Sequence, residues 1–220
     1  MDLDFEAKRA KVAKFRPIDD PLFEVMAEDQ NFVQEMLQVI LEDDGLTVDK
    51  VNKQESIRNL YGRSVRLDAI CTLGNGKICN IEIQKADDDC HLKRVRYNEA
   101  CITTHVTETG LKFEKIPDVI MIYISDFDLF NGEKTIYHVD KVIRENGQTV
   151  YDGVEEIYVN TKIDDNSKIA DYMKLFKQTE IDEPKYPYIS ARIKIAKNGN
   201  GSGICVVIFR KSVTPATPLA

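Results

Sequence analysis

The stretch that decides the fold is residues 64–84, which read SVRLDAICTLGNGKICNIEIQ. From Val65 to Leu73, every second side chain is apolar or small, as in a β-strand with one buried face. The segment from Ile78 to Gln84 alternates in the same way. Between them, Gly74-Asn75-Gly76 indicates a tight turn. We therefore expect an antiparallel β-hairpin.

The length of the turn sets which residues of the hairpin face each other. A three-residue loop, Gly74–Gly76, pairs Leu73 with Lys77, so that the numbers of paired residues sum to 150. Glycine at the last loop position can adopt a positive φ angle, which favours this loop. Asp68 then lies opposite Glu82 on one face of the hairpin. A two-residue loop would instead put the two acids on opposite faces.

The same register makes two further pairs. Arg66 would lie opposite Gln84, and Cys71 opposite Cys79 on the face away from Asp68. We expect the thiols to be reduced and packed in a core. The five cysteines form no C-x-x-C pair and no two histidines stand at ligand spacing, which argues against zinc.

Two carboxylates side by side on a sheet repel each other, and a divalent cation relieves that repulsion. Mg²⁺ takes oxygen ligands and keeps several waters, so two carboxylates and a carbonyl suit it. Asp68 and Glu82 are thus candidate metal ligands, and Gln84 on the same face could orient a water or a phosphate oxygen. The alternative interpretation is a pair of exposed charges on the wet face of a hairpin.

The rest of the chain predicts helices and further strands around this hairpin. A first, short helix is expected to begin at Asp20-Pro21, with Asp20 as its cap. Further helices are expected at 30–41, capped by Asp29, at 89–109, ending at Gly110, and at 167–177, which is the last. Expected strands are 46–52, a central one at 117–126 that is apolar on both faces, and weaker ones at 135–141 and 156–161, separated by a turn at Asn146-Gly147. Together these elements predict an α/β core.

Composition and charge exclude several classes of protein. The chain has 220 residues, 43% hydrophobic content and a formal net charge of −7. No apolar run approaches the roughly 20 residues that cross a bilayer, and residues 1–14 lack the apolar stretch of a signal peptide, so we expect a cytoplasmic protein without a membrane partner. The acidic balance argues against coating nucleic acid by bulk charge, but not against a nucleic-acid enzyme whose acidic site holds metal ions.

The sequence divides into three parts. We expect a charged arm at 1–15, one domain at 16–194 and a flexible tail at 195–220. The tail contains NGNGSG at 198–203 and an apolar run at 204–209, and it has no evident place in the core. A truncated or foreign C-terminus would explain it.

Four segments, in order, carry a resemblance to a known family. Asp68 with IEIQ at 81–84 resembles the PD-(D/E)XK nuclease site in its E-x-Q form, typical of the recombination-promoting nuclease / putative transposase family. DDPLF at 19–23, RVRY at 94–97 and GLKF at 110–113 followed by PDVIMI at 117–122 resemble the family's other segments. The resemblance covers roughly residues 16–190. Glu24 departs from the family's usual Lys, and the tail does not resemble its longer C-terminal helices.

The resemblance implies a restriction-endonuclease-like fold, with a central mixed sheet flanked by helices. It also implies a Mg²⁺-dependent DNA endonuclease linked to recombination or transposition, in which Mn²⁺ substitutes for Mg²⁺. Asp68 and Glu82 would hold the ion together with the backbone carbonyl of Ile83. Gln84 would complete the catalytic set, and Asp20 would stand at the rim of the site.

The helix expected at 89–109 supplies the candidate DNA contacts, which are Lys93, Arg94, Arg96 and Tyr97. The alternative for this helix is a solvated basic face. For the chain as a whole, the alternative is a catalytically inactive DNA- or protein-binding module, or a truncated transposase remnant. The number of subunits stays open, a homodimer included.

Overall fold

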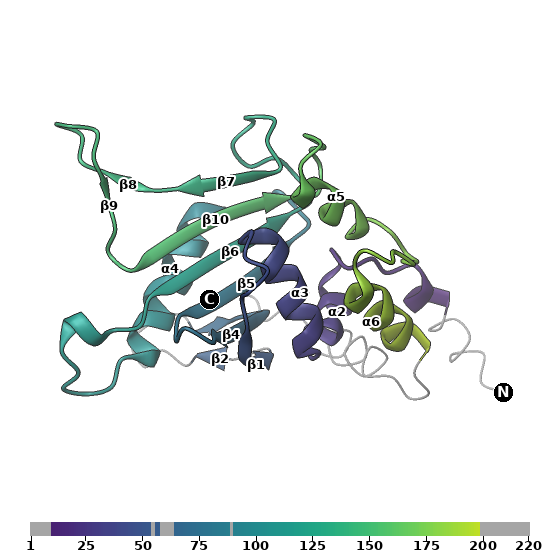
Figure 1. The fold of residues 1–220 in the computed structure, drawn as a ribbon, viewed down its shortest axis with the longest axis horizontal. Helices are drawn as coiled ribbons and strands as arrows, with labels where there is room; N and C mark the ends of the chain where they lie inside the picture. Colours follow the sequence, from purple (N-terminus) through teal and green to yellow (C-terminus); the bar gives the residue numbers. More distant parts are fainter. Residues whose placement is uncertain (1–9, 54–55, 58–63, 89, 199–220) are drawn as a thin grey trace, which may run out of the picture.

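The computed structural model describes residues 10–53, 56–57, 64–88 and 90–198. At its centre lies a six-stranded mixed sheet with the order β1-β4-β5-β6-β10-β7 (Figure 1). The strands of this sheet are β1 (Val48–Lys53), β4 (Ala69–Leu73), β5 (Ile78–Gln84), β6 (Val119–Ser125), β10 (Val154–Asn160) and β7 (Ile136–Val139). β5, β6 and β10 run parallel, whereas β1, β4 and β7 pair antiparallel with their neighbours.

Helices cover both faces of the sheet, as predicted for an α/β core. Figure 1 shows α2, α3, α5 and α6 gathered together, with α4 behind the sheet. Their bounds are α2 (Asp20–Met26), α3 (Gln30–Ile40), α4 (His91–Val106), α5 (Lys168–Leu175) and α6 (Pro187–Asn198), and a short 3₁₀ helix, η1, spans Phe113–Lys115. The first group buries a large apolar core that includes Cys79, Ile81 and Ile83. α4 covers a smaller cluster.

The hairpin at the centre of the sequence has the predicted register. Ala69 pairs with Ile81 and Cys71 with Cys79, so paired numbers sum to 150. Gly76 closes the loop with φ of 84°, which only glycine adopts without strain. The thiols of Cys71 and Cys79 are free and buried, as expected.

The first strand of the hairpin is shorter than predicted. It splits into β4 and a separate β3 (Val65–Arg66), which pairs with β2 (Ser56–Ile57) in a two-stranded sheet. The prediction that Arg66 lies opposite Gln84 is therefore wrong. The break has a local cause, because the Asp68 carboxylate accepts the N–H of Ile83 at 3.0 Å where a strand would offer a backbone carbonyl.

Several other elements agree with the sequence pattern. Asp29 caps α3 by accepting the N–H groups of Asn31 and Phe32. β6 is buried along its whole length and lies between two parallel neighbours, which makes it central. The Asn146-Gly147 turn joins β8 (Lys141–Val142) to β9 (Thr149–Val150).

Three helix predictions need correction. Asp19 rather than Asp20 occupies the N-cap position of α2, and Asp20 lies in its first turn. α4 ends at Val106, before Gly110, because the chain turns extended at Thr107. The helix expected as the last is followed by α6, whose Ile189 and Ala196 are buried.

α6 also passes the boundary expected at residue 194, since it extends to 198. Residues 1–9 of the predicted arm and 199–220 of the predicted tail lie outside the described residues. Within the described part of the chain, no helix is both long and apolar enough to cross a membrane.

Candidate active site

Asp68 and Glu82 meet where β4 ends beside β5. Glu82 is 6% exposed on β5, and Asp68 is half-buried in the bend that follows β3. Asp68 Oδ2 accepts the N–H of Ile83 at 3.0 Å, while the Glu82 carboxylate accepts a hydrogen bond from the backbone of Asp68. The two acids are thus neighbours, as the hairpin register predicts, although Asp68 has left the ladder.

The surroundings of Glu82 disfavour its charge. Burial and the nearby Asp68 carboxylate raise the pKa of Glu82 to about 8, against the opposing effects of Asn80 and Arg94. Near neutral pH the pair of carboxyl groups therefore retains a proton in the absence of a cation.

Asn80 lies beside Glu82, and one of its two polar side-chain atoms is hydrogen-bonded to Glu82. The Asn80 side chain is fully buried, and its Nδ2 donates to Glu82 Oε1 at 3.2 Å. Its Oδ1 has no hydrogen-bond partner among the described residues. The carboxyl groups of Asp68 and Glu82 themselves make a donor set of oxygens alone, which suits a hard cation such as Mg²⁺ or Mn²⁺ better than zinc.

A cation at this place would have few protein ligands. Among the described residues, no group of three His, Cys, Asp or Glu side chains could hold a metal ion together. Two carboxylates would have to be completed by backbone oxygen and water. That composition is typical of Mg²⁺, which dehydrates reluctantly.

Gln84 is held in one orientation by its neighbours. Its Oε1 accepts from Arg94 Nη1 at 2.7 Å. Its Nε2 donates to the Ala86 carbonyl at 2.8 Å and to Asp88 Oδ1 at 3.3 Å. The amide oxygen of Gln84 is therefore directed at the guanidinium of α4.

The start of α4 is fixed to the sheet by a histidine that the sequence did not single out. His91 is 4% exposed, and its Nδ1 lies 2.7 Å from Tyr123 Oη. Its Nε2 lies 2.9 Å from Asp87 Oδ1, and its ring centroid is 4.9 Å from that of Phe127. His91 is thus a buried residue with partners at both ring nitrogens, and it anchors the helix beside Tyr123.

A basic cavity of about 640 Å³ opens next to Glu82, between β3 and α4. Its lining includes the four predicted DNA-contact residues, which are Lys93, Arg94, Arg96 and Tyr97, together with Arg66. Lys93 and Arg96 are exposed, whereas Arg94 and Tyr97 are half-buried. The helix face thus presents positive charge in a chain that is acidic overall.

Two residues of α2, the site candidate Asp20 and Glu24, which replaces the family's usual Lys, have different surroundings. Arg66 Nη2 lies 3.8 Å from Glu24 Oε2, so the residue that departs from the family pattern sits opposite a cation. Asp20 is exposed, whereas its neighbour Asp19 is 8% exposed and receives Lys85 Nζ at 2.6 Å.

Asp19 is therefore the buried acid of α2. Burial raises its pKa, but hydrogen bonds from Lys85 and Arg16 outweigh burial and lower it overall. In the sequence, only the apolar Ile18 directly before Asp19 distinguishes the two acids. Ile18 is fully buried in the structure.

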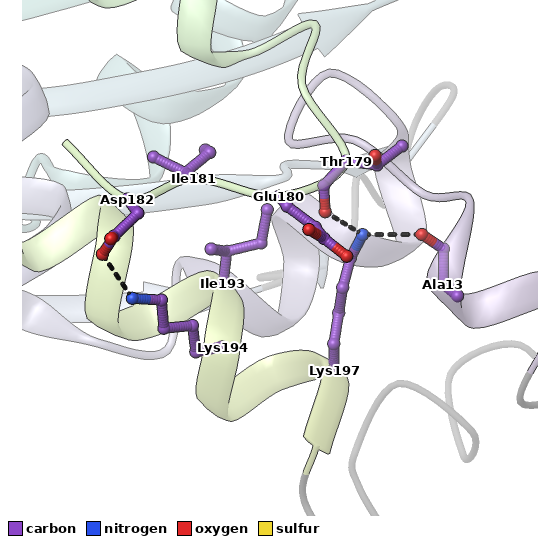
Figure 2. Close-up of a pocket in the computed structure, with 8 residues that line it drawn as sticks. All are labelled: Ala13, Thr179, Glu180, Ile181, Asp182, Ile193, Lys194 and Lys197. Atoms are coloured by element: carbon purple, nitrogen blue, oxygen red, sulfur yellow. Dashed lines mark hydrogen bonds and ion pairs between the residues drawn. The ribbon is translucent and has the colours of Figure 1, made fainter.

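A second pocket, of about 410 Å³, lies against α6 and the segment before it (Figure 2). Lys197 Nζ donates there to the backbone carbonyls of Ala13 and Thr179. Lys194 Nζ pairs with Asp182 Oδ1 at 2.6 Å. Both cations are engaged by the protein itself, and the contacts of Lys197 tie α6 to the N-terminal segment.

Comparison with known proteins agrees with this geometry. Residues 22–180 match the family model described as PD-(D/E)XK nuclease family transposase. No curated protein and no solved structure matches. The resemblance seen in the sequence is confirmed, and the six-stranded mixed sheet flanked by helices is consistent with the restriction-endonuclease-like fold. The match indicates a nuclease or a transposase-related function in general.

Proposed function

We propose that this chain, which belongs to the PD-(D/E)XK nuclease family transposases, is a metal-dependent DNA endonuclease that acts in recombination or transposition. The observation that carries the proposal is the contact between Asp68 and Glu82 at the edge of a basic cavity. Two acids held together bind a cation, and the basic lining attracts a polyanion. Metal-dependent hydrolysis of DNA uses both.

Asp68, Glu82 and the carbonyl of Ile83 would hold Mg²⁺, or Mn²⁺ in its place. The N–H and C=O of one strand residue point to the same side, so the Ile83 carbonyl faces the edge where its N–H meets Asp68. When bound, such an ion lowers the pKa of a water and neutralises charge at the phosphate. Both carboxyl groups must be deprotonated to hold the ion. Their mutual repulsion opposes this until a cation is present.

The first two turns of α4 would contact the DNA backbone. Lys93 and Arg96 are exposed beside the cavity, and Tyr97 borders it. Cations placed in this way position the duplex without reading its sequence. Asp20, exposed in the first turn of α2, is proposed only as a carboxylate at the rim of the site.

Nicking of supercoiled plasmid tests the proposal. The wild type should nick with Mg²⁺ or Mn²⁺ and not with EDTA, and Asp68→Ala or Glu82→Ala should lower the rate at least about 10³-fold. Asp44→Ala is the matched control, because Asp44 is exposed and pairs with Lys168 on α5. Its rate should equal that of the wild type.

Two outcomes would contradict the proposal. One is a wild type that nicks equally well in EDTA, or as well after Asp68→Ala. The other is a folded wild type that binds DNA and never nicks it, which would support the alternative of an inactive DNA-binding module.

A further inference from the structure

We propose that Arg94 is a catalytic residue whose guanidinium stabilises the charge on the scissile phosphate, and that Gln84 is the positioning residue that holds it there. This inference rests on the proposed endonuclease function and assigns a separate task within it. It divides the basic residues of α4 into one that acts on the reaction and others that hold the DNA.

The first observation is the contact between Arg94 and the strand that carries Glu82. Arg94 Nη1 donates to Gln84 Oε1 at 2.7 Å, two residues from Glu82 on the same face of β5. Arg94 and Glu82 line one cavity.

The second observation is that the amide N–H groups of Gln84 are already engaged by partners outside the cavity that Glu82 and Arg94 line. Gln84 Nε2 is engaged by the Ala86 carbonyl at 2.8 Å and by Asp88 Oδ1 at 3.3 Å. The remaining polar atom, Oε1, accepts from Arg94. The geometry therefore gives Gln84 the task of orienting a cation.

The third observation concerns the neighbouring cations of the chain. Lys85 follows Gln84 directly, but its Nζ lies 2.6 Å from Asp19 Oδ1. Lys85 therefore serves the N-cap residue of α2 and not the cavity. Lys93 and Arg96 line the cavity but are exposed, whereas Arg94 is half-buried.

The fourth observation is that Arg94 stands on a fixed support. It lies one helical turn after His91, which is bound to Tyr123 on β6 and to Asp87. Tyr123 is the register partner of Glu82 between β5 and β6. The helix that carries Arg94 and the strand that carries Glu82 are thus attached to the same central strand, which preorganises the pair.

The chemistry of hydrolysis explains why a cation is needed there. The oxygen of water forms a new bond to phosphorus, the bond from phosphorus to the leaving sugar oxygen breaks, and a proton passes from the water to the leaving oxygen overall. Negative charge gathers on the phosphate oxygens as the two bonds exchange. A guanidinium that donates hydrogen bonds in a partly buried site stabilises that charge more than it stabilises the bound DNA.

The test compares neighbouring cations of one helix. Arg94→Gln should lower kcat about 10²- to 10³-fold and change the Kd for DNA, measured without metal, less than about threefold. Lys93→Gln and Arg96→Gln should instead weaken DNA binding and reduce its salt dependence by about one counterion each. Lys168→Gln, whose ammonium pairs with Asp44, is the control outside the site and should resemble the wild type.

A second variant separates a catalytic arginine from a structural one. Gln84→Lys combined with Arg94→Gln restores a cation beside Glu82, and kcat should recover at least about tenfold relative to Arg94→Gln alone. A merely structural Arg94 would not be replaced by a lysine on the strand. Melting curves of each variant verify that the protein is folded, and Arg94→Lys, which keeps the charge, should lose less activity than Arg94→Gln.

The outcomes distinguish this inference from the proposed function. If the wild type does not nick DNA, both are overturned. If nicking depends on Asp68 but Arg94→Gln keeps its kcat, or changes only the Kd for DNA, the endonuclease stands and the role of Arg94 is wrong. If the double variant fails to recover while folded, Arg94 is structural.

Discussion

The two faces of strand β5 differ in almost every physical property, although they belong to the same seven residues. On one face Cys79, Ile81 and Ile83 lie in the large apolar core beneath α2, α3, α5 and α6. On the other face Asn80 and Glu82 are buried beneath α4 with polar neighbours. One face stabilises the fold, and the other holds a carboxyl group that resists being charged.

The difference between the two faces explains how a protein, with the marginal stability that proteins have in general, can keep a buried acid. A buried acid with a raised pKa costs stability, and the hydrogen bond from Asn80 and the positive charge of Arg94 offset only part of that cost. The closed core on the opposite face offsets it, because successive side chains of the same strand point there. Substitutions one residue apart on β5 should therefore separate activity from stability.

The largest effect should follow Glu82→Gln. Cleavage should fall at least about 10³-fold, equivalent to about 4 kcal/mol of transition-state stabilisation. The metal-free protein should be as stable as the wild type or more so, because a carboxyl group disfavoured by burial and by Asp68 is gone. Nicking rates and urea unfolding in EDTA measure the two quantities. A clearly less stable Glu82→Gln protein would show that the acid is structural.

The opposite pattern should follow Ile81→Ala on the core face. Ile81 is fully buried, and its truncation should cost about 2–5 kcal/mol of unfolding free energy. Its kcat per folded molecule should stay near that of the wild type, because the acids and the cavity are untouched. Ile81→Val, with a cost of about 0.5–1.5 kcal/mol, grades the effect. A loss of kcat in the folded Ile81→Val protein would break the separation of the two faces.

The hairpin could be predicted from the sequence because its determinants are local. The loop Gly74–Gly76 sets the register, and alternation sets which side chains share a face. The pairing of Cys71 with Cys79 follows from these two facts. The central position of β6 also follows, since a strand apolar on both faces must be covered on both.

Features that depend on distant contacts could not be predicted. α6 begins where Glu35 accepts the N–H groups of Tyr188 and Ile189, more than 150 residues away along the chain. Nothing near Pro187 announces that cap. The buried acid of α2 is likewise chosen by a distant residue, Lys85.

The candidate site could be predicted in part for the same reason. The nearness of Asp68 and Glu82 is a consequence of register, and the sequence predicts it. The strand break at Asp68 could not be predicted from the sequence, because it depends on a side chain that replaces a backbone acceptor for the N–H of Ile83. The contact of Arg94 with Gln84 needs α4 to be packed on the sheet, which periodicity alone cannot specify.

Mg²⁺ should stabilise the protein through the polar face only. A cation that binds the native site and not the unfolded chain adds about 2.7 kcal/mol at 100 times its Kd. The melting temperature of the wild type should therefore rise at millimolar Mg²⁺. Asp68→Asn should abolish the rise, whereas Ile81→Val should keep it from a lower starting temperature. An equal rise in wild type and Asp68→Asn would place the cation elsewhere.

The pH dependence of stability should sharpen the contrast further. The pKa of Glu82 is about 8 in the folded protein, against an ordinary value of 4.5. Between these values the folded state binds more protons than the unfolded state, so stability falls as pH rises, by at most about 1.4 kcal/mol per pH unit. Above pH 8 this contribution should level off.

Urea unfolding of the metal-free protein at several pH values measures this slope. Glu82→Gln should remove its share of the slope, and Ile81→Val should shift the whole curve without changing its shape. A Glu82→Gln protein with the wild-type slope would assign the bound proton to another group.

The smallest effect should come from the cap of α3, which belongs to the core face. Asp29 accepts hydrogen bonds from the N–H of Asn31 at 2.9 Å and of Phe32 at 3.4 Å, and these satisfy two donors that the helix leaves open. Asp29→Ala should cost about 1 kcal/mol, and Asp29→Asn much less, since Asn caps nearly as well. α3 packs on the core side and reaches neither Glu82 nor Arg94, so kcat and the Mg²⁺-induced rise in melting temperature should be unchanged in both variants. A cap acts on one helix end without moving the core. The two Asp29 variants therefore test, with the smallest change in stability, whether the two faces of β5 act independently. If a 1 kcal/mol loss at Asp29 lowered kcat in the fully folded protein, stability on one face of β5 would be setting the geometry of the other.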